Sequence, residues 1–184
     1  MPGGFIWVGS ESNDPRGKVK TFGVAAAHAT RLSPGDAVVI TSTSDANGLP
    51  LVDAAAAGAA FTGIIESVDP NFATEAFTDI GLPAGVAGFV KVNTDPRAIY
   101  EVDVSNGPLV ITDVNLNLPL VATAATVSGG LSISNMTVNK TGAATTETIE
   151  WRLVKLVTGS DGVLGSRCQV RANNTTTIAG AAGV

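Results

Sequence analysis

Short stretches of alternating apolar and polar residues, separated by turn residues, recur along the chain and constrain its fold most strongly. Residues 99–104 are the clearest case, because tyrosine and valine side chains share one face and two carboxylates share the other. Pro34-Gly35 is typical of a type II turn, and Asn47-Gly48 is typical of a β-hairpin turn. Such signals return about every 8–12 residues, and no stretch sustains a helical period. We therefore predict an all-β fold, an antiparallel β-barrel or β-sandwich of jelly-roll-like character with an extended N-terminal arm.

The individual strands follow from runs of β-branched and aromatic residues between these turns. Alternation changes face near Asn135, which predicts a β-bulge or a strand end there. It changes again after Leu153, which predicts a bulge or a passage into a two-sided apolar environment. The expected strands are residues 19–29, 37–43, 51–55, 61–68, 88–93, 99–104, 131–138, 146–157 and 167–172.

The chain divides into four parts by composition. Residues 1–17 read as an N-terminal arm, because an apolar tetrapeptide is followed by a polar segment rich in turn residues. Residues 18–94 are expected to form a β-barrel part and residues 95–175 a β-sandwich part. Residues 176–184, composed of Thr, Ala, Gly, Ile and Val, are expected to be a flexible tail.

Charged residues make up only 15% of the chain, against about 25% in an average globular domain. The mean hydropathy is +0.30, yet no apolar run approaches the roughly 18 residues of a membrane helix. Two explanations fit this composition equally well. Neighbouring subunits can cover much of the surface, or small residues can fill the core beneath a neutral Thr, Ser and Asn surface.

The charge distribution argues against nucleic acid as a partner. The net charge is −5, whereas phosphate binding requires clustered Lys and Arg. The exception is the short basic group Arg16, Lys18 and Lys20, which we interpret as a solvated or partner-facing patch. The N-terminus lacks the basic and apolar regions of a secretory leader, so we expect no secretory signal.

The residues that carry out catalysis are scarce. The chain has one histidine, His28, and one cysteine, Cys168, so neither a zinc site nor an internal disulfide is expected. Asp45, Asn47 and Asp53 share a loop region, but their spacing does not match a calcium-binding loop. Carboxylate pairs on the predicted strands are more simply explained as solvent-exposed. We therefore expect no enzyme activity, no cofactor and no metal.

Several segments resemble virion structural proteins of tailed bacteriophages that decorate or cement the head. In the second half the resemblance covers residues 95–102, 113–117, 128–132, 152–157 and 170–173. In the first half it covers residues 32–38, 63–65 and 88–92, which resemble small β-barrels of phage capsid proteins. The chain departs from the family pattern at Tyr100, where phenylalanine is usual, and at Asn115, where glycine is usual.

This resemblance implies a non-catalytic virion protein on the exterior of the phage capsid, made in the cytoplasm of the bacterial host. Its expected partners are the major capsid protein and other copies of itself, as a homotrimer before a dimer; nucleic acid and membrane are not expected. The alternative is a receptor- or carbohydrate-binding module of a tail spike or fibre. We expect the capsid to be contacted by Phe5, Ile6, Trp7, Val8, Arg16, Lys18 and Lys20.

Overall fold

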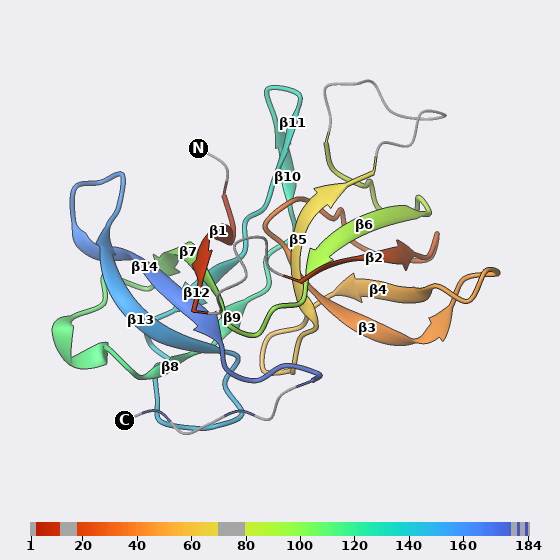
Figure 1. Ribbon diagram of the computed structural model, residues 1–184. Helices are drawn as coiled ribbons and strands as arrows, with labels where there is room; N and C mark the ends of the chain where they lie inside the picture. The colour runs from red at the N-terminus through yellow and green to blue at the C-terminus, as the bar shows by residue number, and fades with distance from the viewer. Residues whose placement is uncertain (1–2, 12–17, 70–79, 178–179, 181–182, 184) are drawn as a thin grey trace.

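The computed structural model describes residues 3–11, 18–69, 80–177, 180 and 183. These residues form strands and a single short 3-10 turn, η1 (Ile111–Asp113), so the all-β prediction is confirmed. The strands gather into two bodies that lie side by side, a barrel and a larger open sheet (Figure 1). No helix in the described part of the chain is long and apolar enough to cross a bilayer.

The barrel is closed and lies between residues 19 and 93. Its strands follow the order β2 (Val19–Val24), β4 (Pro50–Ala54), β3 (Ala37–Ser44), β5 (Gly63–Val68) and β6 (Gly88–Asn93). The predicted turn at Pro34-Gly35 is present, with the Asp36 amide donating to the Ser33 carbonyl at 3.0 Å and Gly35 at φ +90°. β2 and β4 pair in parallel, unlike the antiparallel pairing expected throughout. The barrel core consists of Phe22, Val24, Leu32, Val38, Val52, Ile65, Leu82, Val90 and Val92.

The second body is a seven-stranded sheet. Its strands follow the order β8 (Asn117–Leu118), β13 (Trp151–Thr158), β14 (Leu164–Ala172), β7 (Ala98–Ser105), β12 (Thr137–Asn139) and β9 (Leu120–Val121), with β1 (Ile6–Ser10) also paired to β7. The pairing of β13 with β14 shifts register between Leu153 and Lys155, which confirms the predicted bulge. The segment expected at residues 131–138 is two strands separated by residues 134–136, which corresponds to the strand end predicted near Asn135.

A two-stranded hairpin stands out from the rest of the molecule. Its strands are β10 (Thr126–Ser128) and β11 (Leu131–Ile133), which pair only with each other (Figure 1). All three residues of β10 are exposed, whereas Ser132 of β11 is buried beside Ser33 of the barrel, to which it is hydrogen-bonded. The middle of the hairpin therefore contacts the barrel part of the chain.

An aromatic cluster centred on Trp151 joins the barrel to the sheet. The Trp151 ring is stacked between Phe5 at 4.3 Å and Phe61 at 4.5 Å, measured between ring centroids. Tyr100 meets both Trp151 and Phe5 edge-on. These four side chains are at most 3% exposed and share one hydrophobic cluster with Ala37 and Ile64 of the barrel strands. The two halves of the chain thus have a common buried junction beside the separate barrel core.

Glu150 belongs to this junction, although the strand expected at residues 146–157 included it. The residue is fully buried, and its carboxylate accepts hydrogen bonds from the backbone amides of Gly58 and Leu120. The reason is that the strand begins at Trp151 instead of residue 146, so Glu150 lies in the preceding turn. Its side chain ties a barrel loop to the sheet by satisfying amides that would otherwise be buried without partners.

Candidate docking groove

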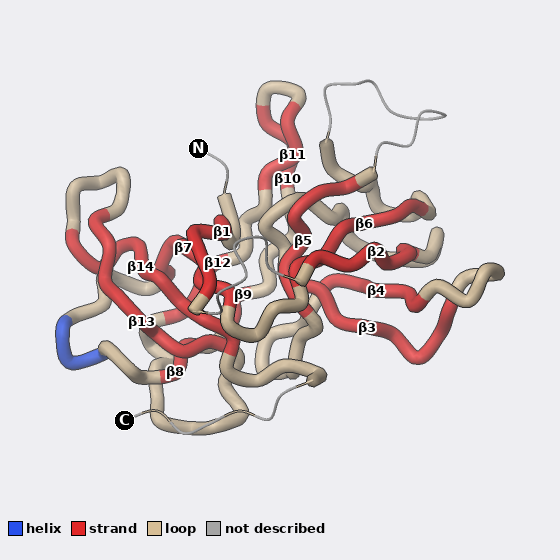
Figure 2. The backbone as a smooth tube through the Cα atoms, in the orientation of Figure 1, coloured by secondary structure: helices blue, strands red, loops and turns tan. Residues whose placement is uncertain are grey.

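The apolar half of the N-terminal arm packs on its own chain. Residues 6–10 form β1 along β7, and the Phe5 amide donates to the Gly35 carbonyl at 3.0 Å. Phe5 is 3% exposed and stacked on Trp151. The capsid contact expected of Phe5 stays a prediction; in this chain its ring completes the junction and is almost fully buried. The tube in Figure 2 shows this strand lying against the sheet.

The other predicted contact residues divide into four groups. Ile6 and Trp7 are half-buried, and Trp7 packs against the junction cluster. Val8 is 45% exposed and remains open to a partner. Arg16 lies outside the described residues. Lys18 and Lys20 are exposed, and both line the same groove.

This groove, which we call the lysine groove, has a volume of about 670 Å³ and lies where barrel strands meet the segments leading into and out of the sheet. β2 contributes its lysine and aromatic lining, and β3 contributes Ile40, which is 39% exposed. Thr94 and Pro96 line it from the connection between barrel and sheet, and Thr176 lines it from the segment after β14. The full lining is Lys18, Lys20, Thr21, Phe22, Ile40, Pro50, Thr62, Thr94, Pro96, Thr176 and Thr177.

Hydrogen bonds inside the chain hold the walls of the lysine groove. The Thr62 hydroxyl accepts the Ile40 amide at 2.8 Å and lies 3.2 Å from the Thr176 hydroxyl. The Thr176 amide donates to the Phe61 carbonyl at 2.8 Å. The Thr94 amide and hydroxyl both donate to the Lys18 carbonyl at 2.9 Å. The backbone around the groove is thus fixed without a ligand.

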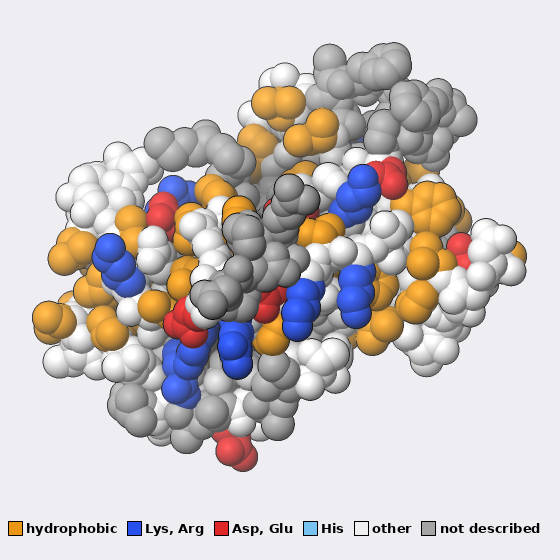
Figure 3. Space-filling view, viewed as in Figure 1, with side chains coloured by type: hydrophobic (Ala, Val, Ile, Leu, Met, Phe, Trp, Pro, Cys, Tyr) orange, Lys and Arg blue, Asp and Glu red, His pale blue; other side chains and the backbone are white. Residues whose placement is uncertain are grey.

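The charged side chains that line the lysine groove are both positive. Its only charged lining residues are Lys18 and Lys20, and neither makes an ion pair with another described residue. Lysine and arginine side chains form a row across this view of the molecule (Figure 3). In a chain with a net charge of −5, a cationic groove favours an anionic partner.

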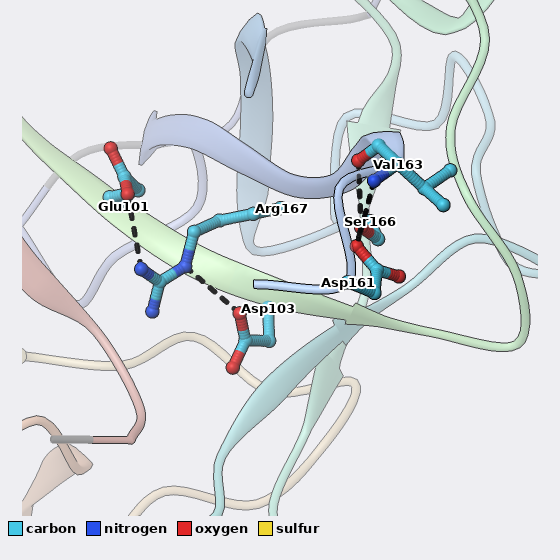
Figure 4. A network of polar contacts seen from close by, with 6 residues as sticks. All are labelled: Glu101, Asp103, Asp161, Val163, Ser166 and Arg167. Carbon is cyan, nitrogen blue, oxygen red and sulfur yellow. Dashed lines mark hydrogen bonds and ion pairs between the residues drawn. The ribbon is translucent and has the colours of Figure 1, made fainter. Parts of the chain in front are cut away.

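The outer face of the sheet differs, because its arginines are already paired. Arg167 on β14 contacts Glu101 at 3.2 Å and Asp103 at 2.9 Å on β7 (Figure 4). Arg171 pairs with Glu11 at 2.7 Å. These pairs tie neighbouring strands together across the sheet and leave less positive potential for a partner than the lysine groove does.

A second cavity, of about 590 Å³, is lined by residues 54–57 and 120–124, with Arg31, Asp36 and Met136. Asp36 is 1% exposed, and its Oδ1 makes no hydrogen bond within the described residues. Burial raises the pKa of Asp36 to about 6, opposed by the Ser134 hydroxyl and the Ser33 amide. Because Oδ1 is itself inaccessible to solvent, a ligand in this cavity cannot reach it.

The single cysteine and the single histidine of the chain are both buried. Cys168 is buried, and burial together with Asp103 and Glu101 raises the pKa of its thiol to about 12, which leaves it unreactive. His28 is 4% exposed, and its Nδ1 lies 2.8 Å from the Ala25 carbonyl within its own turn. No group of three or more His, Cys, Asp or Glu residues suited to a metal ion occurs in the described ranges.

An exposed apolar patch that was not expected from the sequence lies at the end of the sheet next to η1. The Leu109 amide donates to the Gly165 carbonyl at 2.9 Å, which brings two loops together. The four large apolar side chains on these loops are 44–82% exposed: Val110, Ile111, Val163 and Leu164. We call them the distal patch. Each loop alone reads as a turn, so only the contact between them identifies the patch.

Comparison with known proteins identifies no relative. No protein-family model matches the chain, and no curated protein or solved structure matches it either.

Proposed function

We propose that this chain is a virion structural protein that binds the exterior of an assembled phage capsid and stabilises it by bridging neighbouring capsid subunits. A ligand that binds only the assembled shell opposes disassembly by mass action. Repeated attachment around one shell strengthens modest individual contacts through effective concentration. The partners are the major capsid protein and other copies of this chain, as a homotrimer before a dimer.

The distal patch is the observation that carries this proposal. Ile111 is 82% exposed and Leu164 is 59% exposed, at the end of a rigid sheet. Isolated exposed apolar residues are ordinary on a protein surface, but a group of them is typical of a surface that another protein covers. The low proportion of charged residues in the chain agrees with such coverage.

The rival function, a carbohydrate-binding module of a tail spike or fibre, has less support. Sugar platforms usually present exposed aromatic rings, and Trp151 and Phe5 are both buried in the junction. Among the aromatic side chains of the described residues, Phe89 alone is highly exposed, at 45%.

Cryo-electron microscopy of virions that carry this protein tests the proposal. We expect density for the two-part β body on the outside of the head. Density confined to the tail would refute the capsid function and favour the rival.

A binding assay on heads that lack the protein tests the distal patch. Ile111→Asp should lower occupancy, because it places a charge in an apolar contact. Val127→Asp adds the same charge at a residue that is 50% exposed on the separate hairpin, and serves as the matched control. Equal occupancy for the two variants would exclude the distal patch from the contact.

A further inference from the structure

We propose that the lysine groove binds an extended peptide segment carrying acidic side chains at alternate positions. The inference rests on the proposed function in one respect, since it assigns that segment to a capsid subunit. The groove itself is a feature of this chain alone.

The spacing of the two lysines supports an extended partner. Lys18 and Lys20 are two residues apart along an extended backbone, which separates their Cα atoms by about 7 Å. Alternate side chains of an extended peptide have the same separation. Two acidic residues at positions i and i+2 of such a peptide can therefore each face one lysine. A helical partner presents neighbouring side chains at i and i+3 or i+4 instead.

The lining between and below the lysines supports the other side chains of the segment. Ile40, Pro50 and Pro96 provide apolar contact, and the buried Phe22 ring lies beneath. The hydrogen bonds of Thr62 and Thr94 hold the walls before a partner arrives. Because the groove is already ordered, little conformational entropy is lost on binding, and a short peptide segment is sufficient to bind.

The same lining argues against sugars and nucleic acids. Phe22 is the only aromatic residue in it and is 7% exposed, so neither a sugar ring nor a base can stack there. Two cations are also fewer than the phosphate contacts that sustain nucleic-acid binding by a chain with a net charge of −5.

Fluorescence anisotropy with labelled octapeptides tests the groove directly. The probes are (Asp-Val)₄ and its uncharged counterpart (Asn-Val)₄. We expect the acidic peptide to bind at 50 mM salt at least about tenfold more tightly than the neutral one, and to dissociate at 1 M salt, where screening is nearly complete. Exposed ion pairs contribute up to about 1 kcal/mol each, or about fivefold in affinity. The double variant Lys18→Ala/Lys20→Ala should therefore bind up to about 25-fold more weakly.

Lys155→Ala is the matched control, because Lys155 is an exposed lysine on the sheet, away from the groove lining. All variants change exposed residues, and identical thermal unfolding will show that they are folded. Equal binding of the two peptides, or equal losses for Lys20→Ala and Lys155→Ala, would overturn the inference. So would a labelled dT₁₂ oligonucleotide that binds as tightly as the acidic peptide, because charge alone would then explain the binding.

These outcomes are separate from the test of the proposed function. If virion maps show density on the head but the acidic peptide does not bind, the inference about the groove is wrong and the proposed capsid function stands. If the acidic peptide binds but virion maps show density only in the tail, the proposed capsid function is wrong and the groove is still a peptide-binding site.

Discussion

Replacing Asp36 by asparagine is expected to stabilise the protein at neutral pH and to have little effect in acid. Asp36 is 1% exposed, with one carboxylate oxygen bonded to the Ser33 amide at 2.8 Å and the other without a hydrogen bond in the described part of the chain. Asparagine retains an oxygen that can accept the Ser33 amide. It removes the charge that burial disfavours.

The size of the effect follows from the pKa of Asp36, which rises from 3.8 to about 6 on folding. Each pH unit by which a pKa rises corresponds to about 1.4 kcal/mol. The folded state therefore loses about 3 kcal/mol relative to the unfolded state once Asp36 is ionised in both. The folded state binds the proton more tightly, so the loss develops as the pH rises from about 4 to about 6 and is complete above that.

Urea unfolding of the wild type and Asp36→Asn at pH values from 3.5 to 8 measures this difference. We expect the free energies of unfolding to coincide near pH 3.5 and to differ by up to about 3 kcal/mol at pH 7.5, with the variant more stable. Asp161→Asn is the control of opposite sign, because hydrogen bonds from Ser166 and Val163 lower the pKa of this exposed carboxylate. A variant that is no more stable at pH 7.5, or a difference independent of pH, would refute the reasoning.

Three further predictions concern the junction and the core. Phe5→Ala should lower the free energy of unfolding by about 3 kcal/mol, measured by urea denaturation, because it leaves a cavity against Trp151; a loss below about 1 kcal/mol would contradict the packing. Glu150→Ala should cost about 2–4 kcal/mol in the same assay, since the Gly58 and Leu120 amides lose their acceptor, whereas Glu147→Ala, at an exposed residue, should cost little. Cys168 should react with a thiol reagent only at the rate of unfolding; rapid labelling of the folded protein would contradict its burial.

Local signals predict the longer strands and the turns of this chain, but not β1 or the short strands β8, β9 and β10. The Pro34-Gly35 turn and the hairpin around Asn47-Gly48 depend on residues that are adjacent in sequence, so their chemistry is visible there. The bulge after Leu153 was also predicted, because a change of face in the alternation has few other causes. The expected strand at residues 19–29 ends at Val24, where Ala-rich sequence offers no strand preference.

Features that depend on distant residues could not be predicted in this way. Nothing near Phe5 indicates that its ring packs on Trp151, and nothing near Glu150 indicates that Gly58 supplies a buried amide. The lysine groove likewise depends on residues that are distant in sequence. Lys18 and Lys20 stand out in the sequence as a basic group, but their groove also requires Thr94 and Thr176, which only the fold brings to them.

The arm residues show why their sequence pattern was ambiguous. An apolar tetrapeptide beside polar residues is compatible with docking on its own domain or on a partner. In the structure these residues dock on their own domain, because β1 pairs with β7. Deleting residues 1–17 would therefore remove Phe5 from the junction as well as any partner contact. Loss of capsid binding by such a deletion would therefore not identify a contact, and single substitutions in the groove are the sharper experiment.

The pairing of β1 with β7 also sets an order of events during synthesis. β1 leaves the ribosome first, yet Ile6 pairs with Glu101, which follows all five strands of the barrel. The barrel can close while β1 still has no partner, and β7 gains its neighbour β14 only after all the other described strands have been made. The aromatic junction, which needs Phe5 and Trp151 together, is thus one of the last parts to form. A nascent chain that stalls before residue 98 would hold all five barrel strands and an N-terminal strand whose partner β7 has not yet been made.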